Sequence, residues 1–241
     1  MLELKNVSFT VPGEGKKILR DVNLTVKDEV LLVITGPNGG GKTTLAKIIA
    51  GIEKPTDGKV YWNGTDVTDM SVTDRAKLGI GYAFQQPVRF KGMAVRDLMA
   101  LASGRDVSER GMCEYLSMVG LCAMDYIERD VDASLSGGEI KRIEIATVLA
   151  RGVSLSVFDE PEAGIDLWSF NSLIDVFKRL RGKRGNSLVV ISHQERILEI
   201  ADEIAVIADG TITAYGAREA MLPGLLGGGD DCVLCPVLKE A

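Results

Sequence analysis

The chain has 241 residues, of which 46% are hydrophobic and 26% are charged, and its formal net charge at pH 7 is −6. This length accommodates one large α/β domain with a sizeable buried core and a small inserted subdomain, and the composition is ordinary for a soluble globular protein. The acidic balance argues against a protein that holds nucleic acid by bulk electrostatic attraction.

The sequence predicts a protein that is neither exported nor inserted in a membrane. Its longest apolar runs, residues 30–34 and 188–191, are strand-sized, whereas a spanning helix needs about 20 residues. The N-terminus lacks the basic start and apolar run of a signal peptide. Cys113 and Cys122 are expected to be reduced thiols, because four cysteines are too few for a disulfide framework in a chain of this size. We therefore expect a cytoplasmic protein.

The first part of the chain predicts an antiparallel unit that leads into a buried strand. Residues 2–9 and 19–26 alternate apolar and polar side chains, which predicts two antiparallel strands around the turn at Pro12 and Gly13. Residues 30–34 form a continuous apolar run that ends in glycine, as a buried parallel strand would. Farther along, the same reasoning predicts one helix and two short strands, at 42–50, 59–62 and 80–84.

The middle of the chain predicts a helical insertion. Residues 94–131 follow a helical pattern with breaks at Gly104 and Gly120, so we expect an inserted helical subdomain at about 87–135. Strand–helix alternation then resumes, which predicts a mostly parallel sheet covered on both faces. The elements expected there are a helix from 139, a strand at 155–158, a helix at 167–180, a strand at 188–191, a helix at 195–201 and a strand at 204–207.

The C-terminal end predicts a linker and a short tail. Residues 224–229 are rich in glycine, so we place the globular domain at 1–222 and the linker with its tail at 223–241. Cys232 and Cys235 could supply half of a four-thiolate site for zinc or an iron–sulfur cluster, with a second chain supplying the rest. A flexible tail with two free thiols is the interpretation that we favour.

A glycine-rich loop follows the buried strand and fits the pattern G-x-x-x-x-G-K-[ST]. Backbone N–H groups of such a loop turn toward phosphate oxygens, which requires glycine at several positions. Lys42 would supply a cation to the β- and γ-phosphates and Thr43 a hydroxyl to Mg²⁺, while the next helix directs its positive end at the anion. We expect ATP to bind along Gly36, Pro37, Asn38, Gly39, Gly40, Gly41, Lys42, Thr43 and Thr44.

The predicted strand at 155–158 ends in two carboxylates, Asp159 and Glu160. A site that hydrolyses a metal-bound nucleotide needs one carboxylate to hold the metal and another near the attacking water. Asp159 would do the first and Glu160 the second. Alone, a strand followed by a charged turn would be the better interpretation, but together with the phosphate loop the pair predicts ATP hydrolysis.

The motif LSGGE, residues 135–139, begins a predicted helix and offers a second phosphate-binding helix terminus. One nucleotide cannot easily use both termini. At this point the sequence resembles the ABC ATPase superfamily over about residues 2–215. The resemblance implies a P-loop NTPase fold and an ATP-dependent head-to-tail homodimer, in which Ser136, Gly137 and Gly138 of one subunit close over the γ-phosphate held by the other.

The same resemblance assigns four more positions. Gln85 matches the Q-loop glutamine that touches Mg²⁺ and reports to partner proteins, with Gln86 as the alternative. Asp166 matches the end of the D-loop, which crosses the dimer interface, and His193 matches the switch histidine that contacts the γ-phosphate. Val11 stands where the family usually stacks an aromatic ring on adenine, so we expect weak contact with the base.

Several local segments resemble the SufC family, the soluble ABC ATPases of the Suf iron–sulfur cluster assembly scaffold. Transporter ATPases more often carry a glutamine–arginine pair and a small residue where Lys141 and Glu144 stand. This resemblance implies that ATP-driven closure moves a SufB/SufD-like scaffold protein. The other segments that carry it are 75–76, 79–80, 83–88, 159–166 and 192–198.

Two other classes of partner are alternatives to the Suf-type scaffold, and with the first of them this chain would use the same catalytic residues. The first is a membrane transporter, of which the chain would be the nucleotide-binding subunit. The second is a complex of DNA maintenance or translation, for which the basic run at 178–184 is the best support. That run is better explained as cations that complement a helix dipole, and we expect no nucleic-acid partner.

The segment after Gln85 predicts where a partner docks. Residues 88–93 combine charged side chains with Phe90 and Met93, which suits an apolar contact rimmed by charge. The alternative is that Phe90 belongs to the core.

Overall fold

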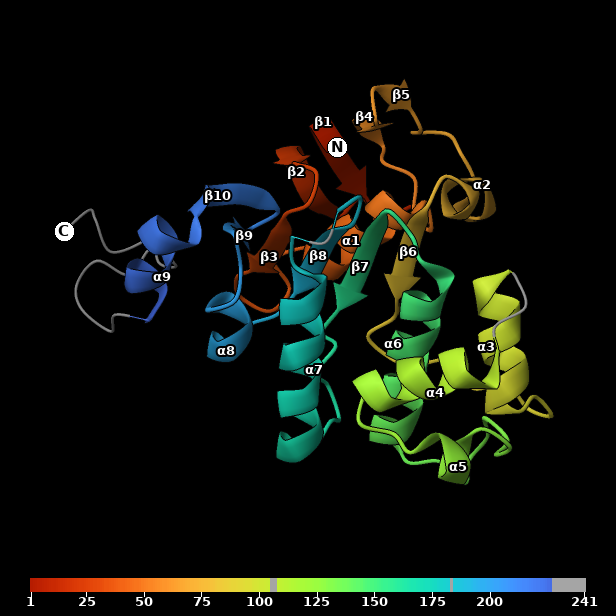
Figure 1. Ribbon diagram of the computed structural model, residues 1–241. Helices are drawn as coiled ribbons and strands as arrows, with labels where there is room; N and C mark the ends of the chain where they lie inside the picture. Colours follow the sequence, from red (N-terminus) through yellow and green to blue (C-terminus); the bar gives the residue numbers. More distant parts are fainter. Residues whose placement is uncertain (105–107, 183, 227–241) are drawn as a thin grey trace.

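The computed structural model describes residues 1–104, 108–182 and 184–226, and its ribbon is shown in Figure 1. The larger of two sheets has the strand order β10-β9-β3-β8-β7-β6. All its neighbouring strands are parallel except the edge pair of β9 and β10. The bounds are β3 (Leu31–Thr35), β6 (Ile80–Ala83), β7 (Leu155–Asp159), β8 (Ser187–Ile191), β9 (Glu203–Ala208) and β10 (Thr211–Ala217).

The second sheet is antiparallel and has the strand order β2-β1-β4-β5. Figure 1 shows it above the larger sheet, next to the N-terminus. This is the antiparallel β subdomain that the alternating N-terminal pattern predicts. Its strands are β1 (Leu2–Thr10), β2 (Lys17–Val26), β4 (Asp57–Trp62) and β5 (Thr65–Asp66).

The helices cover the larger sheet and extend to one side of it. Helices α3 to α5 form the expected helical insertion, in which α3 and α4 pack against α6, and Figure 1 shows them away from the antiparallel sheet. The bounds are α1 (Lys42–Ala50), α2 (Val72–Lys77), α3 (Val95–Ser103), α4 (Glu109–Met118), α5 (Ala123–Tyr126), α6 (Gly137–Arg151), α7 (Leu167–Leu180), α8 (Glu195–Leu198) and α9 (Arg218–Leu226).

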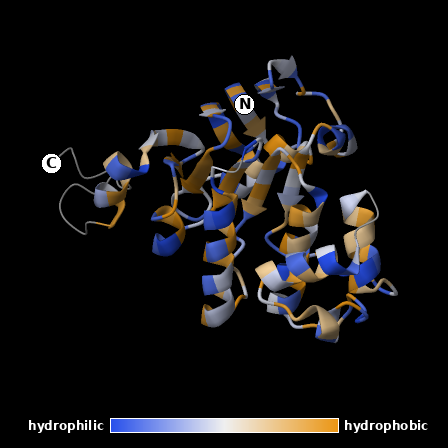
Figure 2. Ribbon diagram, in the orientation of Figure 1, coloured by the Kyte–Doolittle hydropathy of each residue, from blue (hydrophilic) through white to orange (hydrophobic). Residues whose placement is uncertain are grey.

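Apolar side chains alternate between the two faces of the central strands. Along β3, Leu31 and Val33 belong to the core that the helices from α3 onward share, while Leu32 and Ile34 belong to the core shared with α1 and the antiparallel sheet. Successive side chains of a strand point to opposite faces, so a strand with both faces covered reads as a continuous apolar run. Figure 2 shows these central strands as largely hydrophobic.

The α/β fold class predicted from the sequence is confirmed, and α1 and α7 begin and end at the predicted residues. The prediction omits α2, β5, β10 and α9. The first of these carries a helix-start signal, because Ser71 accepts a hydrogen bond from the N–H of Asp74 and so caps α2. The third follows Asp209-Gly210, a dipeptide typical of hairpin turns.

Helix α9 extends past the expected end of the domain. Met221, Leu222 and Leu225 pack against the apolar core, so the helix continues to Leu226 although it contains Pro223. The expected start of the linker at 223 therefore lies inside α9. Cys232 and Cys235 lie outside the described residues, whereas Cys113 is half-buried and Cys122 exposed, both as free thiols. Among the described residues, no helix is both long and apolar enough to cross a bilayer.

A buried arginine anchors the C-terminal end of α1. The guanidinium of Arg75, which is 0% exposed, donates to the carbonyls of Ile48 at 2.6 Å and Ile49 at 2.9 Å, and to that of Thr68 at 3.0 Å. Burial lowers the pKa of Arg75, and a cation at this end of a helix complements the helix dipole. Arg75 thus fixes the helix whose other end carries the phosphate loop.

Candidate nucleotide site

The candidate site lies at the carboxyl edge of the parallel strands, where ligands of such sheets bind. Four strands deliver predicted site residues to this edge. Gly36 follows β3, Gln85 lies two residues after β6, Glu160 follows β7, and His193 lies two residues after β8. The topology therefore gathers residues that are up to 157 positions apart in the sequence, between Gly36 and His193.

The phosphate loop requires glycine because it packs tightly against neighbouring backbone. A Cβ on Gly36 would lie 2.1 Å from the carbonyl oxygen of Ile207, and one on Gly40 would lie 2.8 Å from the same atom. Gly36 and Gly41 also have φ angles of 135° and 102°, which side chains disfavour. The loop is thereby held in a shape that only glycine tolerates at these positions.

The loop opens a helix whose first N–H groups face a cavity. The earliest N–H that bonds back within α1 is that of Leu45, which donates to Gly41 at 2.9 Å, so the N–H groups of Lys42, Thr43 and Thr44 are available to an anion. The cavity has a volume of about 410 Å³. Its lining consists of Lys16, Ile18, Asn38, Gly39, Gly41, Lys42, Thr43, Thr44, Gln85 and Glu160.

Lys42 is oriented by its own loop. Its ammonium donates to the carbonyls of Gly36 at 2.8 Å and Pro37 at 2.9 Å, and the residue is only 6% exposed. Burial lowers the pKa of Lys42, while Glu160 and Asp159 act in the opposite direction. Two of its three N–H donors go to the loop, so the third can serve a phosphate in the cavity.

Asp159 and Thr43 provide two oxygen atoms side by side. The Thr43 hydroxyl donates to Oδ1 of Asp159 at 3.2 Å, and the Tyr82 hydroxyl donates to Oδ2 at 3.0 Å. Burial raises the pKa of Asp159, and these two hydrogen bonds act in the opposite direction. Hydroxyl and carboxylate oxygens are the ligands that Mg²⁺ prefers, so the donor set fits that ion.

Gln85 and Glu160 meet at the wall of the cavity. The amide nitrogen of Gln85 donates to Oε2 of Glu160 at 2.6 Å, which leaves the amide oxygen of Gln85 as a further ligand atom. Glu160 has a positive φ of 43°, and its N–H donates to the carbonyl of Ile191 at 3.0 Å. Gln86 does not line the cavity, so of the two glutamines considered from the sequence the structure places Gln85 there.

The LSGGE segment lies apart from this cavity, at the start of α6. Ser136 caps the helix, since its hydroxyl accepts from the N–H of Glu139 at 3.2 Å and its N–H donates to the Glu139 carboxylate at 2.7 Å. A Cβ on Gly138 would lie 2.8 Å from the carbonyl oxygen of Gly164, whereas one on Gly137 would meet open space. Ser136 and Gly137 are exposed, so this helix terminus faces outward and is accessible to another molecule.

Asp166 and His193 are also outside the cavity lining. The Asp166 carboxylate caps α7 by accepting from the N–H groups of Trp168 and Ser169, both at 3.0 Å. Its hydrogen bonds to Ser169 and the backbone lower its pKa. His193 is exposed next to Ser192, whose hydroxyl donates to Glu162 at 2.5 Å. Within one chain, the cavity is therefore lined without either residue.

Several residues of the site were not found from the sequence. Lys16 and Ile18 line the cavity. Val11, at the position where the family usually carries an adenine-stacking aromatic, is not among the lining residues and packs half-buried against the apolar core. Tyr82 contacts Asp159 from the neighbouring strand β6. The sequence held no signal for this contact, because it depends on the pairing of β6 with β7.

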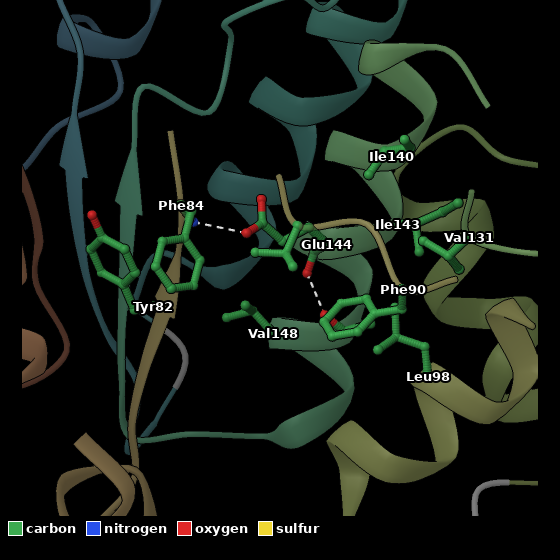
Figure 3. A pocket seen from close by; sticks show the side chains of 11 residues that line it. Tyr82, Phe84, Phe90, Leu98, Val131, Ile140, Ile143, Glu144 and Val148 are labelled. Atoms are coloured by element: carbon green, nitrogen blue, oxygen red, sulfur yellow. Dashed lines mark hydrogen bonds between the residues drawn. The ribbon is translucent and has the colours of Figure 1, made fainter. Parts of the chain in front are cut away.

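An apolar pocket lies beside the candidate site, between β6, α3 and α6 (Figure 3). Its volume is about 160 Å³, and Phe84 and Phe90 are part of its wall. Glu144 is its charged member, and Figure 3 shows this side chain between α6 and the backbone of Phe84. The other lining residues are Tyr82, Val88, Leu98, Val131, Ile140, Ile143, Thr147 and Val148.

The sequence is similar to known ATP-binding proteins of ABC transporters and to ATP-dependent transporters. The sequence profile described as ABC transporter matches residues 19–163. An uncharacterized ABC transporter ATP-binding protein of Methanocaldococcus jannaschii is 40% identical over 88% of each chain. The probable ATP-dependent transporter ycf16 of Cyanophora paradoxa is 32% identical over 91% of this chain and 89% of its own.

Solved structures show the same similarity. A dimeric ATP-binding cassette in a post-hydrolysis state, bound to ADP and phosphate, has a TM-score of 0.80 and 26% identity, with 90% of this chain and 99% of that chain covered. A dimeric bacterial ABC transporter cassette has a TM-score of 0.82 with the same identity and coverage.

Proposed function

The chain belongs to the ABC transporter family of ATP-binding cassettes and is an ATPase, and we propose that it drives a separate partner protein docked beside Gln85. The observation that carries the proposal is the apolar pocket next to Gln85 and Glu160. Phe84 and Phe90 line it and are 38% and 39% exposed. Exposed aromatic side chains around a pocket are typical anchors for a partner.

The phosphate loop would hold the ATP phosphates. Thr43, Asp159 and Gln85 would hold Mg²⁺, which neutralises phosphate charge during transfer. Lys42 presents its remaining donor to the β- and γ-phosphates, and the N–H groups at the start of α1 add further hydrogen bonds. Glu160 accepts a proton from the attacking water, and Gln85 orients the Glu160 carboxylate through its amide.

A second copy of the chain would complete the site. Ser136, Gly137 and Gly138 form an outward-facing helix terminus that the cavity of the same chain does not use, and such a terminus favours an anion. The dimeric structures similar to this chain support an assembly of two cassettes. In our proposal each nucleotide lies between the phosphate loop of one chain and the LSGGE segment of the other, where His193 and Asp166 also contact it.

The partner that we propose first is a membrane transporter. The comparisons favour this alternative over the scaffold that the SufC resemblance implies, because the relatives carry transporter names. One observation favours a Suf-type scaffold as the second candidate. Lys141 and Glu144, which the SufC resemblance includes, form an ion pair beside the apolar pocket, with Nζ and Oε2 3.3 Å apart.

Replacing Phe90 by Ala is expected to weaken the complex with the partner about 10–100-fold, the loss typical of an aromatic anchor at an interface. ATP binding by the isolated subunit should stay unchanged, because Phe90 does not line the nucleotide cavity. Pull-down with the tagged subunit from detergent-solubilised membranes and from the detergent-free soluble fraction measures both the loss and the partner class.

Leu101→Ala is the matched control, since Leu101 is apolar and 69% exposed but lies outside the apolar pocket. Recovery of a polytopic membrane protein supports the transporter, and recovery of a detergent-free scaffold complex supports the second candidate. If Phe90→Ala captures as much partner as the unaltered chain, the pocket is not the docking site.

A further inference from the structure

An ion pair on α6 holds both backbone groups of one residue next to Gln85. The N–H of Phe84 donates to Oε1 of Glu144 at 2.8 Å, and the ammonium of Lys141 donates to the carbonyl of Phe84. Lys141 and Glu144 pair with each other at 3.3 Å. Phe84, Lys141 and Glu144 thus close a ring of three interactions that binds the end of β6 to α6.

Lys141 and Glu144 are too deeply buried to be an incidental surface ion pair. The side chain of Lys141 is 0% exposed and that of Glu144 is 13% exposed. Burial raises the pKa of Glu144, while Lys141 and the N–H of Phe84 act in the opposite direction. A buried pair is often no more stable than apolar side chains of the same volume, yet the loss of one partner is costly. Stability alone is therefore a weak reason for this pair.

Phe84 lies between the apolar pocket and the proposed catalytic residues Gln85 and Glu160. Its ring lines the pocket and meets the ring of Tyr82 edge-on at 4.9 Å. The next residue is Gln85, whose amide donates to Glu160 at 2.6 Å. A shift of the Phe84 backbone would therefore move Gln85 relative to Glu160.

The helix that carries Lys141 and Glu144 starts at the LSGGE segment. Helix α6 begins at Gly137, directly after Ser136, and Lys141 and Glu144 lie four and seven residues farther along it. At 1.5 Å per residue these distances are roughly 6 and 10 Å along the axis. The LSGGE segment would contact the nucleotide bound to the other chain in the proposed dimer. A movement of this segment would reach Phe84 over one or two helical turns.

We propose that Lys141 and Glu144 are positioning residues for ATP hydrolysis, which couple α6 to Gln85 through the backbone of Phe84. Their role is to set the geometry between Gln85 and Glu160 according to the position of α6. The inference rests on the proposed catalytic roles of Gln85 and Glu160, and it does not depend on which partner occupies the pocket.

A double-mutant cycle on the isolated subunit tests this coupling. Lys141→Met and Glu144→Gln are each made alone and together with Gln85→Ala. In the unaltered background each is expected to lower kcat about 10-fold, because small displacements of catalytic groups are costly, with ATP affinity within about twofold of the original. In the Gln85→Ala background the same changes should have little further effect, since the group that they position is absent.

A purely structural role gives a different result. The losses would then multiply with that of Gln85→Ala, and this outcome overturns the proposal. Arg151→Gln is the matched control, because it removes an exposed cation from α6 without touching Phe84. If Lys141→Met fails to fold, Glu144→Gln decides, since glutamine keeps the volume and a carbonyl acceptor for the N–H of Phe84.

Amide hydrogen exchange provides a readout that is independent of catalysis. The peptide that contains Phe84 and Gln85 should exchange faster in Lys141→Met or Glu144→Gln, because the N–H and carbonyl of Phe84 lose charged partners. Unchanged exchange of this peptide in both folded variants would contradict the coupling, whatever happens to kcat.

Discussion

Glu160→Gln is expected to lower ATP turnover by ~10²–10⁴-fold, the loss that follows removal of a general base. Glutamine has the same shape, and it faces the same positive φ of 43°, so the backbone strain at this position does not change. Its amide cannot accept a proton from water. ATP affinity should be nearly unchanged, because the phosphates are held by the loop and Lys42. Steady-state kinetics and equilibrium nucleotide binding measure the two effects separately.

The same variant should accumulate as an ATP-dependent dimer, because the nucleotide that closes the two chains is no longer hydrolysed. Size-exclusion chromatography with and without ATP reports this state. Glu114→Gln, an identical chemical change at an exposed position of α4, should behave as the unaltered chain. Turnover of Glu160→Gln at the original rate would show that Glu160 is not the base.

Lys42→Ala is expected to weaken ATP binding about 10–100-fold, since hydrogen bonds to charged groups contribute ~1.5–3 kcal/mol. The lysine is desolvated and held by the Gly36 and Pro37 carbonyls, so no reorganisation is needed when a phosphate enters. Removal of the side chain leaves those carbonyls without this donor and the cavity without its cation. Titration with a fluorescent ATP analogue measures the loss of affinity.

Lys47→Ala controls for the loss of a lysine from the same helix, because Lys47 lies in the last turn of α1, away from the phosphate loop. Its ATP affinity should match that of the unaltered chain. Equal affinities for Lys42→Ala and Lys47→Ala would refute the role assigned to Lys42.

Features that depend on one continuous segment, such as the phosphate loop and helix α7, could be predicted from the sequence. The phosphate loop is contiguous, and its glycines are dictated by local φ angles and by the close approach of Ile207. Helix α7 was also predictable, because Asp166 caps it and its apolar residues recur at helical spacing. The φ angles of the loop and the cap of α7 are local features, whereas the contact with Ile207 is long-range and was not predicted.

Contacts between distant segments could not be predicted from residue patterns alone. Gln85 and Glu160 are 75 positions apart, and they meet only because β6 and β7 are paired in the sheet. Sequence patterns do not reveal strand order, so the resemblance to a family, rather than periodicity, pointed to Gln85. The contact of Tyr82 with Asp159 arises from the same pairing and was missed.

The burial of the ion pair on α6 could not be predicted from the sequence either. Lys141 and Glu144, at i and i+3, resemble an exposed helical ion pair in the sequence. The structure buries them against the backbone of Phe84, 57 positions from Lys141. The packing of α6 against the end of β6 buries these charges, and no local pattern contains that packing.

Interchain crosslinking shows whether two copies of the chain share each nucleotide. Cysteines would replace Asn38 in one chain and Gly137 in another, since Asn38 is exposed at the phosphate loop and a Cβ on Gly137 meets open space. The four native cysteines would first be replaced by serine, and Glu160→Gln would keep ATP in place. We expect a crosslink between the two chains with ATP and none without it. No crosslink with ATP, or one that forms only within a single chain carrying both cysteines, would contradict it.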